Sequence, residues 1–498
     1  MSKSSSTSGK TLLKNSAIYT ASGLLLKCFS FFLLPLYTRY LTTEDYGITN
    51  IAQSFASTMG PLIAFSLFSA VLRFYVDLKD NPERLRRFYG TIMTFVFISS
   101  VIFGGIFYLL RDFLSEKVFS GIDFYPIILV CILGLIFSCQ HQIYGNILKS
   151  QQKAVKTSLL TIIFFFVSVI LNIVFVVYFK LGALGVLLAT FISNALYTAY
   201  FLYDMLSKKY MTICLDFKVL KDALHYSIPI IPHQLSTHIA VLISKVLLGG
   251  SHSLGVLGIY SVASQFGHLS ETVHSYISEA YQPWLFEKLK AKEDGYKLYI
   301  RKMVRMLIAL IGIPFIFISL FSHDYIVLFI DPKFIDAWKI VPLIILVFGI
   351  KTAYYFYIDV LFFYKSASRK IFIATVTGSL SNIILSYFLI PMWGIMGTIS
   401  ANAISMIIRI GIIIFMSQEY EDTGIRLGDF LVNFFTIALF VGGGLSLSFF
   451  VYGNNFSVLN LLFKFAVMGL YIGYIYLMFK TEIKSFYNTV KKSKVSKV

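Results

Sequence analysis

SLLTIIFFFVSVILNIVFVVYF, residues 158–179, carries no charged side chain. A helix needs about 20 apolar residues to cross the hydrocarbon core of a bilayer, so this segment is long enough to span it. Working outward from it, we find about 14 apolar blocks of similar length along the chain. Such blocks favour helices, because the strands of membrane barrels alternate in shorter segments. The sequence therefore predicts an all-α polytopic membrane protein of about 14 transmembrane helices.

The charges of the chain are unevenly placed. Only 14% of the 498 residues are charged, and the net charge is +18. Most Lys and Arg residues lie in every second gap between the apolar blocks, which is the pattern of cytoplasmic loops. The outer gaps hold only Arg39, Arg111, Lys117, Lys180, Lys333 and Lys339. We therefore expect both termini in the cytoplasm, basic loops that contact anionic lipid, and no nucleic-acid partner.

The sequence contains an internal repeat. A shift of 211 residues, from Ser16 to Ser227, aligns residues 16–55 with 227–266 without a gap, and places Gly47 on Gly258. A second match lies near the same offset, where Asn172-Ile173 before a glycine turn corresponds to Asn382-Ile383 before another. Six spans separate the two copies, so the copies share one orientation. Parallel repeats of this kind are typical of transporters that bind substrate between their halves.

The repeat also predicts a division of the chain. We expect a cytoplasmic tail at 1–11, an N-lobe at 12–205, a cytoplasmic linker at 206–222, a C-lobe at 223–417, two additional helices within 429–479 and a basic cytoplasmic tail at 480–498.

Polar side chains form stripes along several expected spans. Gln234, His238 and Lys245, for example, share one face of the seventh span. Ionisable groups are costly inside a membrane and indicate candidate functional sites. The alternative is that hydroxyl and amide groups join helices by hydrogen bonds. The candidate cavity residues are Lys27, Arg73, Gln234, His238, Lys245, Gln265, His268 and Arg409.

Two lysines favour a cavity over simple helix packing. Lys27 and Lys245 lie far from the ends of their expected spans, so neither side chain reaches the interface easily. A mostly basic cavity attracts anions, and phosphate is the commonest large one. A cation exporter would instead need buried carboxylates, which are few here. We therefore expect the cavity to bind a phosphorylated substrate.

The first expected hairpin carries a family motif. The run LPLYTRYLTTEDYG at 34–47 resembles the first-hairpin signature of Wzx-type polysaccharide-biosynthesis and O-antigen flippases. The segment AVLRF at 70–74 resembles their next motif, and the Asn-then-glycine pattern of both repeats is also similar. The resemblance covers roughly residues 15–420. These flippases belong to the multidrug/oligosaccharidyl-lipid/polysaccharide exporter superfamily.

This resemblance implies a fold and a function. The fold is two six-helix lobes in a MATE-like V, here with two additional C-terminal helices. The function is transfer of an undecaprenyl-diphosphate-linked oligosaccharide from the inner to the outer leaflet of the bacterial cytoplasmic membrane. Alternating access, with possible coupling to an H⁺ or Na⁺ gradient, is implied as well. No other cofactor or metal is expected, and a polysaccharide polymerase and chain-length proteins are possible partners.

A charged group lies at the outer end of the first expected span. Arg39 is followed by Glu44 and Asp45, and we assign all three to gating. Two alternatives stay open for Arg39, which are pairing with an acidic neighbour and contact with substrate. Thr42 or Thr43 can also cap the second span, whose N-terminus the two acids complement.

Two other functions are alternatives. A MATE-like drug or cation antiporter would need acidic cavity residues. A membrane-bound glycosyltransferase or polymerase would need catalytic carboxylates or a sizeable outer loop. The longest outer loops, near 111–123 and 323–337, are short, and ordinary loop chemistry accounts for Asp324 in the second. We therefore do not expect an enzyme. No partner can be named for Lys464.

Overall fold

The chain is almost entirely helical. In this computed structural model the described residues are 3–368, 370–453 and 456–495, and no strand occurs among them. Eleven helices are long and apolar enough to cross a membrane, or twelve if the bent pair α3 (Thr43–Ile63) and α4 (Leu67–Leu78) forms one span. The all-α prediction is confirmed, and the chain is a multi-pass membrane protein.

Two long helices account for the difference from the expected 14 spans. Helix α16 (Ile371–Tyr420) is counted once, although its 50 residues contain two expected spans that meet at Gly394. Gly394 has φ +55° and ψ −124°, a backbone conformation that suits glycine because a Cβ would be crowded there. Helix α12 (Leu254–Ala291) is not among the eleven, but its 38 residues are more than enough for a span.

The helices group into two compact units. Unit 1 comprises residues 1–261 and 386–395, and unit 2 comprises 262–385 and 396–498. The boundary of unit 1 falls inside α12 rather than in the predicted linker. The predicted lobes were defined by sequence similarity and not by spatial contacts. They therefore stay a prediction. The tips of both predicted tails, 1–2 and 496–498, lie outside the described residues.

Unit 1 contains α3, α4, the start of α12 and residues 386–395 of α16. Its other helices are α1 (Lys3–Phe32), α2 (Leu34–Tyr40), α5 (Pro82–Leu109), α6 (Arg111–Phe113), α7 (Leu129–Ser150), α8 (Ala154–Asn172), α9 (Gly182–Ser207), α10 (Phe217–Ser227) and α11 (Ile231–Ser251). Short π-helical turns lie at Leu114–Val118, Phe124–Ile128 and Ile173–Tyr178, and a 3₁₀ turn lies at Ile228–Ile230.

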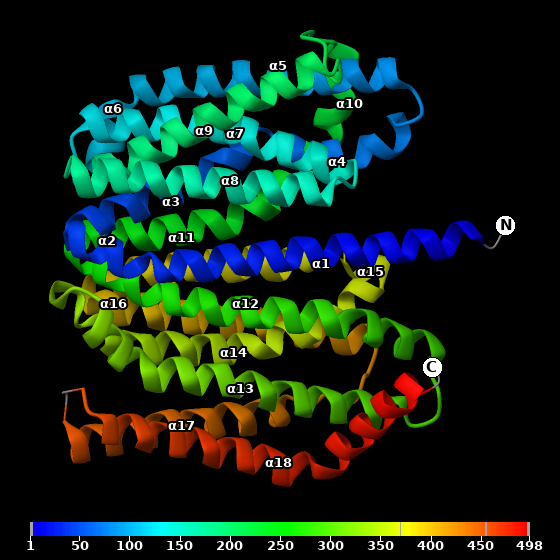
Figure 1. Ribbon diagram of the computed structural model, residues 1–498, viewed down its shortest axis with the longest axis vertical. Coiled ribbons are helices and arrows are strands. Elements are labelled where there is room, and N and C mark those ends of the chain that lie inside the picture. The colour runs from blue at the N-terminus through cyan, green and yellow to red at the C-terminus, as the bar shows by residue number, and fades with distance from the viewer. Residues whose placement is uncertain (1–2, 369, 454–455, 496–498) are drawn as a thin grey trace. The chain divides into compact units, whose positions relative to one another are not determined.

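Helix α7 is the centre of unit 1. It packs against α3, α4, α5 and α9, and Figure 1 shows α5, α7, α8 and α9 running side by side. Cys131, Leu135 and Cys139 recur every fourth residue and are buried, so they form one face of the helix. The thiols of Cys131 and Cys139 donate to the carbonyl oxygens of Ala52 and Gly60 in α3. The two cysteines therefore act as small apolar packing residues.

Unit 2 is organised around α13 (Tyr296–Phe329), which packs against several other helices of the unit. Its remaining elements are α14 (Ala337–Phe363), α15 (Lys365–Ser368), α17 (Leu427–Tyr452), α18 (Val458–Val495), a 3₁₀ turn at Pro332–Phe334 and most of α12 and α16. Helices α14, α17 and α18 pack on α13, and the Phe266 and His274 rings of α12 contact its Tyr325 and Phe315 rings. The two C-terminal helices are therefore part of the packed core of unit 2.

Candidate functional site

The start of α3 is fixed by a reciprocal cap. The Thr42 hydroxyl accepts the backbone N–H of Asp45 at 3.0 Å, and the Asp45 carboxylate accepts the backbone N–H of Thr42 at 3.0 Å. The other oxygen of Asp45 accepts the N–H of Ala183 at the start of α9, at 2.8 Å. Asp45 therefore satisfies orphan donors at two helix N-termini. This bears out the capping role weighed for Thr42.

Helix α3 ends at a sharp break. Phe65 and Ser66 have φ of +47° and +52°, a left-handed conformation that non-glycine residues rarely adopt. The Ser99 hydroxyl donates to the Ile63 carbonyl at 2.6 Å, which satisfies one of the groups freed by the break. The Ser66 hydroxyl donates to Gln234 Oε1 of α11 at 3.0 Å. Strained positions of this kind concentrate at functional sites.

Two more contacts join α3 to α11. The Thr58 hydroxyl donates to the His238 carbonyl at 3.2 Å, and Lys245 Nζ donates to Asn50 Oδ1 at 3.4 Å. With the Ser66–Gln234 bond they form three polar contacts along antiparallel helices, which we call the α3–α11 ladder. Three predicted site residues, Gln234, His238 and Lys245, thus lie together in unit 1.

Lys245 has an unusual environment for a cation within a membrane span. It is half-buried, its partner is a neutral amide, and no carboxylate oxygen among the described residues lies within 4.0 Å of its Nζ. By contrast, Lys351 pairs with Glu271 and Lys464 with Asp324. The charge of Lys245 is therefore available to an anionic ligand.

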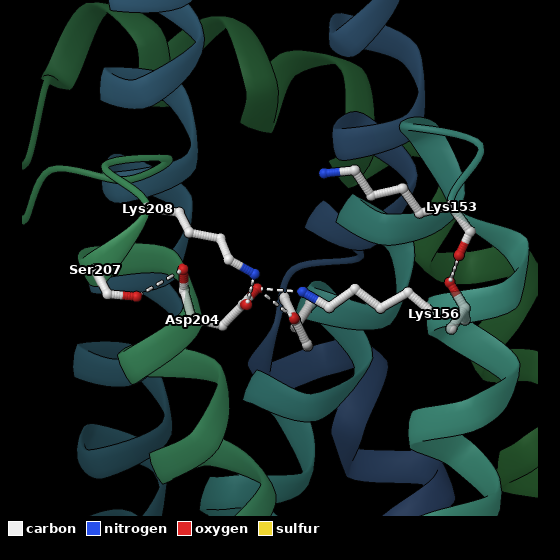
Figure 2. A network of polar contacts seen from close by, with 7 residues as sticks. Lys153, Lys156, Asp204, Ser207 and Lys208 are labelled. Atoms are coloured by element: carbon white, nitrogen blue, oxygen red, sulfur yellow. Dashed lines mark hydrogen bonds and ion pairs between the residues drawn. The ribbon is translucent and has the colours of Figure 1, made fainter.

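A buried carboxylate at the end of α9 pairs with two lysines of unit 1. Asp204 is almost completely buried at the end of α9, and it accepts from Lys156 Nζ at 2.5 Å and Lys208 Nζ at 2.6 Å. Figure 2 shows both ammonium groups converging on this carboxylate. The Tyr144 hydroxyl donates to it as well, at 2.8 Å. The network joins α7, α8 and α9.

Two further predicted basic residues of unit 1 lie elsewhere. Lys27 is on an exposed part of α1, whose packing partner is α8. Arg73 of α4 pairs with Asp77 one turn later at 2.6 Å, and both side chains are about half exposed. An exposed pair of this kind contributes little to stability. Arg73 is therefore compatible with either an anchor or a phosphate contact.

Unit 2 holds a second polar cluster. Glu271 of α12 accepts a short hydrogen bond from Lys351 of α14 and a longer one, 3.4 Å, from the Tyr355 hydroxyl. The predicted residue His268 is exposed one turn before Glu271, with Nδ1 3.8 Å from its carboxylate. We call Glu271, Lys351, Tyr355 and His268 the Glu271 cluster. It combines both signs of charge, unlike the α3–α11 ladder.

The other predicted residues of unit 2 are dispersed. Arg409 of α16 donates to the Ser379 hydroxyl at 3.1 Å and to the Thr375 carbonyl at 3.4 Å. Gln265 is half-buried on α12. The structure does not place either residue in the Glu271 cluster.

The predicted gating residues Arg39 and Glu44 lie in unit 1. Both are exposed beside the capped start of α3.

Sequence reasoning missed Glu271 and misplaced Asp324. Glu271 lies three residues after His268, so the helical spacing could have found it. Asp324 was expected in an outer loop, which is wrong, because α13 continues to Phe329 and buries it. Its carboxylate is the partner of Lys464, at 2.5 Å. Among the described residues, no three His, Cys, Asp or Glu side chains gather to hold a metal ion.

Comparison with known proteins agrees with this architecture. A family of polysaccharide biosynthesis proteins matches residues 12–289. An Lsg locus protein of Haemophilus influenzae is 23% identical over 430 residues, which are 83% of this chain and 99% of that protein.

Two solved transporters share the fold. The lipid II flippase MurJ in an inward closed conformation has a TM-score of 0.70 at 14% identity, over 94% of this chain and all of MurJ. An inward-facing multidrug-resistance MATE transporter of the MOP superfamily has a TM-score of 0.57 at 16% identity, over 79% and 94%. The predicted resemblance is confirmed: this multi-pass membrane chain has a flippase-like transporter fold and belongs to the polysaccharide biosynthesis protein family.

Proposed function

We propose that the chain moves an undecaprenyl-diphosphate-linked oligosaccharide from the inner to the outer leaflet of the bacterial cytoplasmic membrane. The observation that carries this proposal is Lys245, a half-buried cation of the α3–α11 ladder with an amide partner in place of a carboxylate. A diphosphate supplies the negative partner that Lys245 lacks. Charge-assisted hydrogen bonds to phosphate are strong. Family membership gives the polysaccharide context.

The chemistry of individual residues suggests which part of the substrate each one contacts. Lys245 binds a phosphate oxygen, and Asn50 orients its ammonium group by accepting one N–H. Lys27 supplies further positive charge in unit 1, and His238 supplies an imidazole that forms hydrogen bonds. The polyprenyl tail stays in the lipid, where its hydrocarbon is already solvated. Both termini face the cytoplasm, as the distribution of basic loops favours.

Coupling to an ion gradient is assigned to unit 2. Glu271 and Asp359 are carboxylates within helices that span the membrane, and such groups take part in proton and sodium pathways. A polymerase and chain-length proteins are the proposed partners, because they use the repeat units that the transporter delivers.

The proposal is tested by the location of the glycolipid in a deletion strain. An outer-surface glycosidase that cannot cross the membrane digests only the lipid-linked units of the outer leaflet. Accumulation of complete units that resist the enzyme, reversed by the wild-type gene, supports flipping, and the mass of the accumulated lipid identifies the sugar. Unchanged amounts in both leaflets would contradict the proposal.

A second candidate function is a MATE-like drug or cation antiporter, and Asp359 favours it. Its almost completely buried carboxylate accepts from the Ser278 hydroxyl at 2.8 Å and from Gln282 Nε2 at 3.2 Å. No cation among the described residues lies within 4.0 Å of this carboxylate, so it could bind one. Altered tolerance to cationic drugs in the deletion strain, with normal glycolipid, would establish this alternative.

A further inference from the structure

Helix α3 packs against α7 and α11, and specific contacts fix the direction of each neighbour. The thiols of Cys131 and Cys139 in α7 donate to the carbonyl oxygens of Ala52 and Gly60, so α7 runs parallel to α3. The α3–α11 ladder pairs later positions of α3 with earlier positions of α11, so α11 runs antiparallel to it. These contacts show which residues of the three helices lie at a common depth within unit 1.

An unburied polar face runs along the middle of α3. Asn50, Gln53 and Ser57 follow one another at steps of three and four residues, so they share one side of the helix. Asn50 is half-buried and the Gln53 and Ser57 side chains are exposed, whereas Ala52 and Phe55 on other sides of the helix are buried. Polar groups within a span are costly in lipid and usually face a water-filled cavity.

Helix α7 continues this polar face at the depth where α3 ends. The Gln142 side chain is exposed, and a Cβ added at Gly60 would lie 3.8 Å from its Nε2. Asn146 lies one turn later on the same side of α7, and its Nδ2 donates to the Gln142 carbonyl oxygen at 2.9 Å. A Cβ added at Gly145 would have no neighbour within 4 Å, so the space beside them is open. We define the amide face as Asn50, Gln53, Gln142 and Asn146.

Helix packing does not account for the exposed amides. In the part of the chain that the structure describes, the side-chain amides of Gln53 and Gln142 form no hydrogen bond with another group. Each amide is neutral and offers donors and an acceptor side by side. A sugar hydroxyl also donates and accepts, whereas a phosphate is held best by cations. The amide face therefore suits a glycan better than a diphosphate.

Lys245 marks one end of the amide face. Its Nζ donates to Asn50 Oδ1, and Gly60 lies about 15 Å farther along α3, at a rise of about 1.5 Å per residue. The charge pattern places the start of α3 on the outer side, so Gln142 lies on the cytoplasmic side of Lys245. The distance between these two positions accommodates a few sugar rings in a row.

We propose that the amide face binds the glycan of the lipid-linked substrate, whose sugars extend from the diphosphate at Lys245 toward the cytoplasmic side. This inference rests on the proposed function, because that function supplies the diphosphate and its attached sugars. The first sugars contact Gln53, and the later ones contact Gln142 and Asn146. Lys245 thus holds the part common to every lipid-linked unit, and the amide face recognises the length and hydroxyl pattern of the glycan.

Binding measurements separate the glycan from the diphosphate. The full-length protein in detergent is titrated with undecaprenyl diphosphate and with the complete lipid-linked unit isolated from the deletion strain. Gln53→Ala/Gln142→Ala should weaken binding of the complete unit about tenfold and leave that of undecaprenyl diphosphate unchanged, because only the glycan loses hydrogen bonds. Lys245→Ala should weaken binding of both lipids. The matched control is Gln418→Ala, at an exposed position of α16, which should bind both lipids like the wild type.

The outcomes of this titration are distinct. Equal weakening of both lipids by the double variant, or unchanged binding of both, would overturn the glycan site and leave the proposed function standing. A wild-type protein that binds neither lipid would contradict the proposed function instead.

Protection from a chemical label tests the expected position of the glycan. Gln142→Cys, in a protein whose four native cysteines are replaced by alanine, is treated with a water-soluble maleimide. The complete unit should slow labelling several-fold, whereas undecaprenyl diphosphate should not, because only the glycan reaches this depth. The matched control, Gln418→Cys, should be labelled at the same rate with either lipid. Labelling of Gln142→Cys that both lipids slow equally, or that neither slows, would overturn the proposal.

Discussion

Lys464 of α18 lies 2.5 Å from Asp324 of α13, and both side chains are almost completely buried. This ion pair joins the C-terminal helix to the central helix of unit 2. Removing one partner leaves a charge in a medium that solvates it poorly, and that loss commonly costs about 3–5 kcal/mol.

We therefore expect Asp324→Asn and Lys464→Met each to destabilise the protein strongly. The double variant Asp324→Asn/Lys464→Met should recover most of the loss, because no isolated charge remains. Thermal unfolding of the four proteins in detergent gives the pairwise coupling. Additive losses in the double variant would show that the two residues act independently.

Asp204 offers a milder case of the same chemistry. Asp204→Asn removes the acceptor of Lys156 and Lys208, but these lysines are 26% and 52% exposed and can turn to water. We expect a loss of about 1–3 kcal/mol, smaller than that of Asp324→Asn. Melting temperatures of the two variants in one detergent test this order of stability losses. A greater loss for Asp204→Asn than for Asp324→Asn would contradict it.

Lys245 is the key residue of the proposed substrate site. Lys245→Ala should abolish glycan export at normal protein level, and Lys27→Ala should do the same, because each removes a charge meant for the diphosphate. Lys245→Arg should retain part of the activity, since it keeps the charge. Complementation of a deletion strain, with surface polysaccharide as readout, checks this. Full export by both alanine variants would remove the assigned roles.

Glu421 makes stability depend on pH. It follows α16, outside the spans, and accepts hydrogen bonds from Lys292, Tyr296 and Tyr364. Burial raises the pKa of its carboxyl, but these donors outweigh burial and lower the pKa to about 2. The native state thus binds this proton less readily than the unfolded state, whose pKa is about 4.5.

This interaction should stabilise the protein fully above about pH 4.5 and should fade as the pH falls toward 2. We expect about 1–3 kcal/mol from it, because Lys292 is half exposed and screened by solvent. Glu421→Gln should flatten the fall in melting temperature between pH 6 and 3, whereas the exposed Glu419→Gln should leave it unchanged. Parallel curves for wild type and Glu421→Gln would contradict the assignment.

Local sequence features predicted the helical class well. Segments such as 158–179 have no alternative to a helix in lipid, because every backbone group must be paired within the segment. The resemblance of 34–47, together with that of 70–74 and the Asn-then-glycine pattern of both repeats, identified the family. The break within α16 at Gly394 was also predictable, since glycine marks the turn between two expected spans.

The chemistry of the site was harder to predict. Lys245 and Lys464 look alike in sequence, yet one contacts an amide and the other a buried carboxylate. The difference depends on Asn50 and Asp324, which lie 195 and 140 residues away along the chain. Helical periodicity gives the face of one helix, but it cannot say which face of another helix meets it.

The packing of α11 on α3 joins the two repeats of the chain. Helix α11 lies in the second repeat, whereas α3 lies in the first, and the close contact of Gly47 and Gly258 joins the same two copies. Each copy therefore buries polar and glycine surfaces that only the other copy can cover. A chain holding one copy alone would therefore leave these surfaces uncovered.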